Sequence, residues 1–300
     1  MPVAFSDLAL FSLLGITAGT LAGMLGIGGG MVIVPGLFYL FSVIHLPEAA
    51  LIHMAAGSAM GIMLFTASAS TWSHHARGDV QWNIFKQVVP GIGIGVVSGT
   101  LLSSHIDPHW LEIIFGVFLL VVSSRILLTW TPKSDEAHSD EAHSDEARSE
   151  DISEEDGGEE NKRAEDNRQP PSRPVASAIG SLIGLKSGIL GIGGGALSVP
   201  FLLYCGLPMT HASGTSAAFT LPIAITGTLA FGLFAPTDAQ IHWSTGYIYW
   251  PAIALVAPFT VLGAPLGTLL SHRVPAKSLK RLFALLLLGV GSKMILGSFG

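Results

Sequence analysis

The chain has 300 residues, of which 49% are hydrophobic and 12% are charged, and its mean hydropathy is +0.57. A soluble domain carries about 25% charged residues, so this chain has too few charges to cover a soluble surface. The charges are also concentrated, because residues 131–174 hold 15 of the 21 acidic side chains and 6 of the 15 basic ones. The composition therefore excludes an ordinary soluble protein and indicates several membrane spans.

Ten apolar segments follow in chain order, five on each side of the charged stretch. They lie at 8–25, 30–44, 50–72, 87–104, 111–130, 175–190, 195–206, 212–235, 247–270 and 282–298. The second segment of each group has only about 12–15 residues, whereas a full helical span needs about 20. Each of these two begins at a glycine-rich break and meets a proline, Pro35 or Pro200. We expect an all-α integral membrane protein with short, broken or re-entrant helices at these two breaks.

The glycine-rich break occurs twice, at an offset of 165 residues. Residues 23–35 read GMLGIGGGMVIVP, and residues 188–200 read GILGIGGGALSVP. A duplicated break inside apolar segments is typical of transporters built from two repeats. The sequence therefore predicts a first transmembrane repeat at 1–130, a linker at 131–174 and a second transmembrane repeat at 175–300.

The linker contains the tandem repeats SDEAH, SDEAH and SDEAR between residues 134 and 148. It has too little apolar surface to fold, so we predict a disordered acidic tether. His138 and His143 could be taken for a metal tract, but a solvated repeat is the better interpretation of this composition. We predict no metal site and no cofactor.

Basic residues in the loops indicate the orientation, because Lys and Arg collect on the cytoplasmic side. Arg77 and Lys86 flank the loop after the third segment, whereas the matching loop of the second half, 236–246, has neither. The last loop behaves in the opposite way, with none at 104–110 and four at 271–281. The two halves therefore prefer opposite orientations. We predict two inverted repeats of about five segments in the cytoplasmic (inner) membrane, with the linker inside and both termini outside.

The glycine breaks are candidates for a substrate site. Irregular backbone survives at membrane depth only where it is buried in protein or lines a polar cavity, and glycine lets a ligand approach the main chain. Helices that begin at the breaks would point free N–H groups and positive dipole ends at the same place, which suits an anion. Tight helix packing is the alternative. The candidate residues are Gly26, Gly28, Gly29, Gly30, Gly191, Gly193, Gly194 and Gly195.

Hydroxyl side chains and one lysine extend this candidate site. Ala56-Gly57-Ser58 corresponds to Ser213-Gly214-Thr215-Ser216. Ser58, Thr215 and Ser216 could donate to an anion or could make hydrogen bonds between helices. Lys186 lies inside an apolar run two residues before Gly188. It could neutralise an anion or could extend its ammonium group toward the cytoplasm.

Other polar and small residues have simpler interpretations. Gly91, Gly95 and Gly99 recur every four residues, as expected for a face of small residues that packs against another helix. A proton-relay role for His53 and His211 is possible, but a satisfied buried or interfacial histidine is the commoner case. The chain has no HExxH, GxSxG, CxxC or P-loop motif, so we predict that it is not an enzyme.

The paired GxxGIGGGxxxxP motifs, together with the A-G-S and S-G-T-S segments, resemble the sulfite exporter TauE/SafE family over nearly the whole chain apart from the linker. This resemblance implies a plasma-membrane permease for sulfite, sulfonates or other organic anions. Gly26–Gly30 and Gly191–Gly195 are the positions that match the family motif. The acidic linker is longer than this family leads us to expect.

We therefore predict a secondary transporter that moves a small anion, sulfite or an organosulfonate, by alternating access. A passive anion channel is the alternative, and uphill flux driven by an ion gradient would distinguish the carrier from the channel. The expected partners are the anionic substrate, a coupling ion (a proton or sodium) and the lipid bilayer, with no nucleic acid. The sequence leaves the oligomeric state open.

A reporter enzyme fused after Gly300 tests the predicted topology. An odd number of crossings in each half puts both ends of the chain outside the cytoplasm, so the fusion should give a non-cytoplasmic signal. A fusion within the linker serves as the control, and its signal should be cytoplasmic. A cytoplasmic signal after Gly300 would contradict the inverted repeat.

Overall fold

The computed structural model describes residues 5–25, 29–128, 173–235, 241–271 and 276–298. The described part of the first half forms α1 (Phe5–Leu25), α2 (Gly30–Val43), the 3-10 turn η1 (Glu48–Ala50), α3 (Leu51–Ala76), α4 (Trp82–His105) and α5 (Pro108–Leu128). The second half forms α7 (Arg173–Leu190), α8 (Gly195–Tyr204), α9 (Met209–Leu233), β1 (Ser244–Thr245), β2 (Ile248–Tyr249), α10 (Trp250–Ser271) and α11 (Ala276–Ser298). Among the described residues, 5 helices are long and apolar enough to cross a membrane, which confirms the all-α membrane protein. Most of the predicted linker lies outside these residues.

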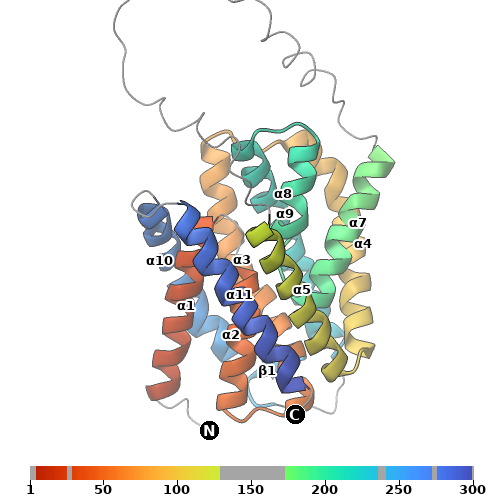
Figure 1. Ribbon diagram of the computed structural model, residues 1–300. Coiled ribbons are helices and arrows are strands. Elements are labelled where there is room, and N and C mark those ends of the chain that lie inside the picture. The colour runs from red at the N-terminus through yellow and green to blue at the C-terminus, as the bar shows by residue number, and fades with distance from the viewer. Residues whose placement is uncertain (1–4, 26–28, 129–172, 236–240, 272–275, 299–300) are drawn as a thin grey trace, which may run out of the picture.

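The path of the chain is visible in Figure 1. Helix α1 begins and α11 ends at the lower end of the molecule, whereas α5 ends and α7 begins at the upper end. Each half therefore makes one net passage through the molecule, and the two passages run in opposite directions. An inverted repeat requires this arrangement, and the repeat itself stays a prediction.

The helices pack mainly against helices of the other half of the chain. Helix α4 packs against α7, and its counterpart α10 packs against α1. The third helices α3 and α9 pack on each other, as do the fifth helices α5 and α11. Each short helix packs on the helix that follows it, α2 on α3 and α8 on α9. The main interfaces therefore join helices from different halves of the chain.

Glycines bring α4 and α7 into backbone contact. A Cβ atom added at Gly91, Gly95 or Gly99 would collide with a carbonyl oxygen of α7, that of Ser177, Ser181 or Leu185 respectively. Glycines of α7 meet α4 in the same way, with Gly184 against the Ile92 carbonyl. Small residues drive helix association in lipid because they allow close van der Waals packing. This face of small residues is a packing surface, as its spacing predicts.

The two short helices begin where they were expected, and α8 is slightly shorter than the predicted segment 195–206. Helix α2 has 14 residues and α8 has 10, and each contains its proline at the sixth position. Helices α1 and α2 form a hairpin that begins and ends at the lower end, while α7 and α8 begin and end at the upper end (Figure 1). The glycine-rich breaks are therefore the points where each hairpin reverses direction inside the molecule.

Substituting Gly95→Ala should weaken the contact between α4 and α7. The added Cβ collides with the Ser181 carbonyl oxygen, so the helices have to move apart. Overpacking of this kind costs about 1–3 kcal/mol. Gly93→Ala is the matched control, because a Cβ at Gly93 has no neighbour within 4 Å. Thermal unfolding of the purified variants measures both effects, and equal unfolding temperatures would contradict the interface.

Candidate functional site

Among the described residues, each glycine-rich break has a glycine with left-handed backbone. Gly29 has φ of 68° and precedes α2, and Gly191 has φ of 67° and follows α7. Residues with a side chain rarely adopt this conformation, whereas glycine does so at little cost. The chain can therefore reverse direction between α1 and α2 and between α7 and α8. We call residues 29–30 the first corner and residues 191–195 the second corner. The predicted site residues Gly26 and Gly28 lie outside the described residues.

The two corners meet in the middle of the molecule. A Cβ atom added at Gly30 would lie 3.2 Å from the backbone nitrogen of Gly193 and 3.0 Å from the sulfur of Met63. One added at Gly193 would lie 3.4 Å from the same sulfur and 3.0 Å from Cγ2 of Thr220. Met63 lies midway along the 26-residue helix α3 and is fully buried. The structure therefore brings the two motifs together at mid-depth, with Met63 at their contact.

Two helices begin at these corners without side-chain caps. Neither Gly29 nor Gly194, the residues that precede α2 and α8, provides a side-chain hydrogen bond to the first turn. Both helix starts are buried. The first amides of a helix have no acceptor within the helix, and its N-terminus carries a partial positive charge. Two positive helix ends therefore converge in the interior, which is favourable for an anion.

Polar side chains surround the second corner. The hydroxyl oxygens of Ser198 and Ser216 lie 2.6 Å apart, and both side chains are buried. The Thr220 hydroxyl donates to the Ser216 carbonyl at 3.2 Å. The ammonium group of Lys186 donates to the Gly193 carbonyl at 3.2 Å. Ser216 and Lys186, two of the predicted site residues, thus lie beside the corner.

Ser198 and Thr220 are additional candidates that the sequence interpretation missed. A Cβ at Gly194 would lie 3.5 Å from the Ser198 hydroxyl, and Thr220 touches Gly193 as described above. Ser198 lies in the first turn of the short helix, three residues after Gly195, and Thr220 lies one turn after Ser216. Helical spacing from residues already selected could have identified both.

The first corner has apolar residues at the positions that are polar at the second. At the offset of 165 residues, Ile33 corresponds to Ser198 and Leu21 to Lys186. At the offset of 157 residues that aligns Gly57 with Gly214, Ala59 corresponds to Ser216 and Met63 to Thr220. The contact between the corners therefore has polar side chains around the second corner and apolar ones around the first.

The other two predicted hydroxyls contact the loops before α4 and α10. The Thr215 hydroxyl accepts the backbone N–H of Gln81 at 2.9 Å, and the Ser58 hydroxyl accepts that of Tyr249 at 3.0 Å. Gln81 and Tyr249 directly precede α4 and α10. Each hydroxyl therefore holds the start of a long helix from the other half of the chain, with Thr215 of α9 at the start of α4 and Ser58 of α3 at the start of α10. A role for Ser58 and Thr215 in binding an anion stays a prediction.

The glycine before each hydroxyl makes room for the same loop. A Cβ at Gly57 would lie 2.6 Å from the Tyr247 carbonyl oxygen, and one at Gly214 would lie 2.7 Å from Cβ of Asp79. Residues 79 and 247 are related by the offset of 168 residues that relates Trp82 to Trp250. The duplicated Gly-hydroxyl pair is therefore a repeated structural contact that holds the loop before a long helix. We call the Gln81–Thr215 contact the upper latch and the Tyr249–Ser58 contact the lower latch, because α4 begins at the upper end of the molecule and α10 at the lower end (Figure 1).

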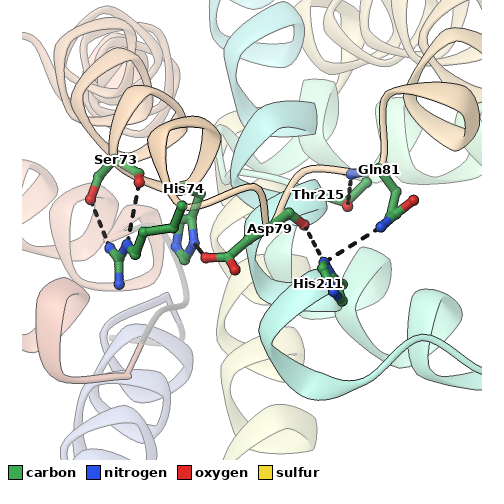
Figure 2. Close-up of polar contacts among 7 residues, drawn as sticks. Ser73, His74, Asp79, Gln81, His211 and Thr215 are labelled. Carbon is green, nitrogen blue, oxygen red and sulfur yellow. Dashed lines mark hydrogen bonds and ion pairs between the residues drawn. The ribbon is translucent and has the colours of Figure 1, made fainter.

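Additional polar contacts secure the upper latch. Figure 2 shows Asp79 between two histidines, His74 of α3 and His211 of α9. The Asp79 carboxylate lies 2.9 Å from Nδ1 of His74, and its backbone carbonyl lies 3.0 Å from Nδ1 of His211. Arg77 donates to the Ser73 hydroxyl at 2.7 Å. These contacts fix the loop between α3 and α4 against the first turns of α9.

Comparison with known proteins agrees with the sequence resemblance. The model of the family described as "Sulfite exporter TauE/SafE" matches residues 11–294. A "Probable membrane transporter protein" of Haemophilus influenzae is 29% identical over 294 residues, which cover 97% of this chain and 99% of that protein. The "Probable membrane transporter protein YunE" of Bacillus subtilis is 25% identical, with 94% of this chain and 95% of that protein covered. No solved structure matches the chain.

Substituting Thr215→Val should loosen the upper latch. Valine keeps the shape of threonine but removes the acceptor for the Gln81 N–H, which costs about 1–3 kcal/mol for a buried donor. We expect a lower unfolding temperature and faster hydrogen exchange at residues 81–85. Thr226→Val is the matched control, because the Thr226 hydroxyl bonds to Pro222 of its own helix. If both variants behave alike, the latch contributes nothing to stability.

Proposed function

This chain belongs to the sulfite exporter TauE/SafE family, and we propose that it is a secondary transporter for a small sulfur-containing anion, sulfite or an organosulfonate. The observation that carries this proposal is the convergence of two buried, uncapped helix starts midway along α3. The relatives are named as probable membrane transporter proteins, and their coverage of nearly the whole chain supports the same role here.

The anion would rest against the second corner. Backbone amides at the start of α8 would donate to its oxygens, and hydrogen bonds to a charged group contribute about 1.5–3 kcal/mol each. The hydroxyls of Ser198, Ser216 and Thr220 would add donors, and the Lys186 ammonium would balance the charge. This set of groups suits an oxyanion with several acceptor oxygens.

Met63 would control access to this site. Its sulfur touches both corners, so a bound anion has to displace the side chain. Methionine has three rotatable bonds and adapts its shape readily. The packed centre also supports a carrier over the alternative of a passive anion channel, because a channel needs a continuous open path.

Alternating access would then depend on the interfaces between the halves. Backbone contacts join α4 to α7, and a similar contact of Gly19 with the Thr260 carbonyl joins α1 to α10. We infer that each of these pairs moves as one body, so that a moving unit contains helices from both repeats. The Gln81–Thr215 and Tyr249–Ser58 latches at opposite ends would open in turn.

The charge distribution supports the proposed orientation. The basic residues Arg77, Lys86, Arg125, Arg173 and Arg281 lie at or near the upper ends of their helices, while Lys293 lies toward the lower end (Figure 1). Because cytoplasmic loops are rich in Lys and Arg, we propose that the upper end faces the cytoplasm. The linker would then be cytoplasmic, in a protein of the cytoplasmic membrane.

Flux of radiolabelled sulfite or an organosulfonate into proteoliposomes tests this function. Lys186→Met removes the charge but keeps the length of the side chain, so we expect at least about tenfold slower flux from the lost charge interaction. Lys293→Met is the matched control. The Lys186 ammonium lies 5.5 Å from the centroid of the Phe118 ring, and the Lys293 ammonium lies over an aromatic ring in the same way, 4.4 Å from the Tyr39 centroid, but away from the corners. Its flux should equal that of the wild type.

A second variant tests the corner itself. Gly194 has φ of −63°, which leucine tolerates, but a Cβ there would lie 2.9 Å from Cδ1 of Ile223, so Gly194→Leu crowds the second corner through its side chain and not through its backbone. We expect loss of flux in a properly inserted protein. Normal flux in this variant would remove the second corner as the anion site.

A further inference from the structure

His53 is a buried histidine that the anion site does not use. It is the third residue of α3 and is only 2% exposed. Its Nε2 atom lies 2.9 Å from the Ser103 carbonyl oxygen of α4. Its ring stacks on Tyr247 with the centroids 4.9 Å apart. The ring is therefore held firmly between α3, α4 and the hairpin before α10.

These contacts determine where the ring carries its hydrogen. A carbonyl oxygen can only accept, so Nε2 must be the protonated nitrogen of the neutral imidazole. The Nδ1 atom then presents a lone pair. This atom is buried and has no hydrogen-bond partner within the described part of the chain. A buried polar atom without a partner costs about 1–3 kcal/mol, which an apolar residue at this position would avoid.

The buried ring is also connected to the second corner. The Ser103 hydroxyl donates to the Ile189 carbonyl at 3.3 Å, in the last turn of α7 before Gly191. Ala56, one turn after His53 on the same helix, occupies the space that a side chain at Gly191 would need. Ser103 of α4 thus connects the imidazole to the last turn of α7, which leads into the second corner.

Few charged groups act on this ring. The titratable or charged side chains on the elements around the ring are Tyr39 of α2, Glu48 of η1, Lys86 and His105 of α4, Asp107 between α4 and α5, His109, Glu112 and Arg125 of α5, His211 of α9, Tyr247 and Tyr249 of the hairpin, and His74 and His75 of α3 itself. Of these, Tyr247 stacks on His53 and the exposed carboxylate of Asp107 attracts a positive charge on it. Burial raises the pKa of Tyr247, so this phenol stays neutral.

We propose that Nδ1 of His53 binds the proton that is transported together with the anion, an inference that rests on the proposed transport function. A proton from one aqueous side adds to the Nδ1 lone pair and gives an imidazolium ion, and its release to the other side restores the neutral ring. A buried positive charge is costly unless a negative charge lies near it. The anion at the second corner provides that charge, so each ligand favours binding of the other.

Transport of an alkanesulfonate into proteoliposomes containing a pH-sensitive dye tests this coupling. This probe is fully ionised at neutral pH, so it carries no proton of its own. Wild-type uptake should acidify the lumen, and an inward proton gradient should drive uptake uphill. In His53→Gln the side-chain amide can still donate to the Ser103 carbonyl but cannot accept a proton. Downhill sulfonate uptake should persist, while acidification and uphill accumulation should disappear.

His105→Gln is the matched control, because His105 is an exposed histidine at the end of α4, and its coupling should match that of the wild type. Wild-type uptake without acidification, or coupling that survives in His53→Gln, would overturn the role of His53 and leave the transport function standing. No wild-type uptake of sulfite or sulfonate would overturn the transport function together with this inference.

Calorimetry on the wild type decides the matter if His53→Gln fails to fold or to transport. Sulfonate binding to the purified protein is measured in buffers that differ in ionisation enthalpy, which gives the number of protons bound with the anion. We expect uptake of about one proton per anion when the solution pH leaves the free protein unprotonated at this site. Binding without proton uptake would overturn the proposal.

Discussion

Two helices that begin without side-chain caps inside a membrane protein determine the design of this molecule. Lipid provides no hydrogen bonds, so a break in a helix at mid-depth is stable only when it is surrounded by protein or satisfied by a ligand. Here both breaks, at Gly29–Gly30 and at Gly191–Gly195, are buried, and each lies against the other. The surrounding helices pack so that these two breaks stay together, and this requirement explains why the central contact is made by α3 and α9.

The interfaces around the corners use two different kinds of contact. Glycines allow α4 and α7 to touch along their backbones, which leaves little freedom to slide or separate. The latch at Ser58 is a hydrogen bond to the start of a helix, and the latch at Thr215 is one such bond with the contacts of Asp79 beside it. A few hydrogen bonds break more readily than a packed helix interface. A molecule built in this way has rigid helix pairs that cross between the repeats and weak attachments at its two ends. This combination is suited to rocking about a fixed central site.

Much of this arrangement could be predicted from the sequence, because membrane helices appear there as long apolar runs. The ends of the observed helices lie within a few residues of the predicted segments, and the short helices begin at the predicted glycines. Sequence reasoning selected Lys186 and Ser216 because they lie near the glycine motif, and both side chains lie beside the second corner in the structure. The contacts of Ser58 and Thr215 could not be predicted, since their partners Tyr249 and Gln81 lie more than 130 residues away in the sequence. A glycine followed by a hydroxyl residue has the same sequence whether its hydroxyl contacts a ligand or a loop.

Divergence between the two corners is the most informative departure from symmetry. A duplication begins with two equal corners, and equal corners would hold an anion equally well on either side of the centre. In this chain Lys186, Ser198, Ser216 and Thr220 are all on the second side, while the first side has Leu21, Ile33, Ala59 and Met63. The buried His53 is connected through Ser103 to that same second side. Groups that bind negative charge and the group proposed to bind a proton are therefore connected through a single residue of α4, and the charge of a bound anion would offset the cost of the buried imidazolium.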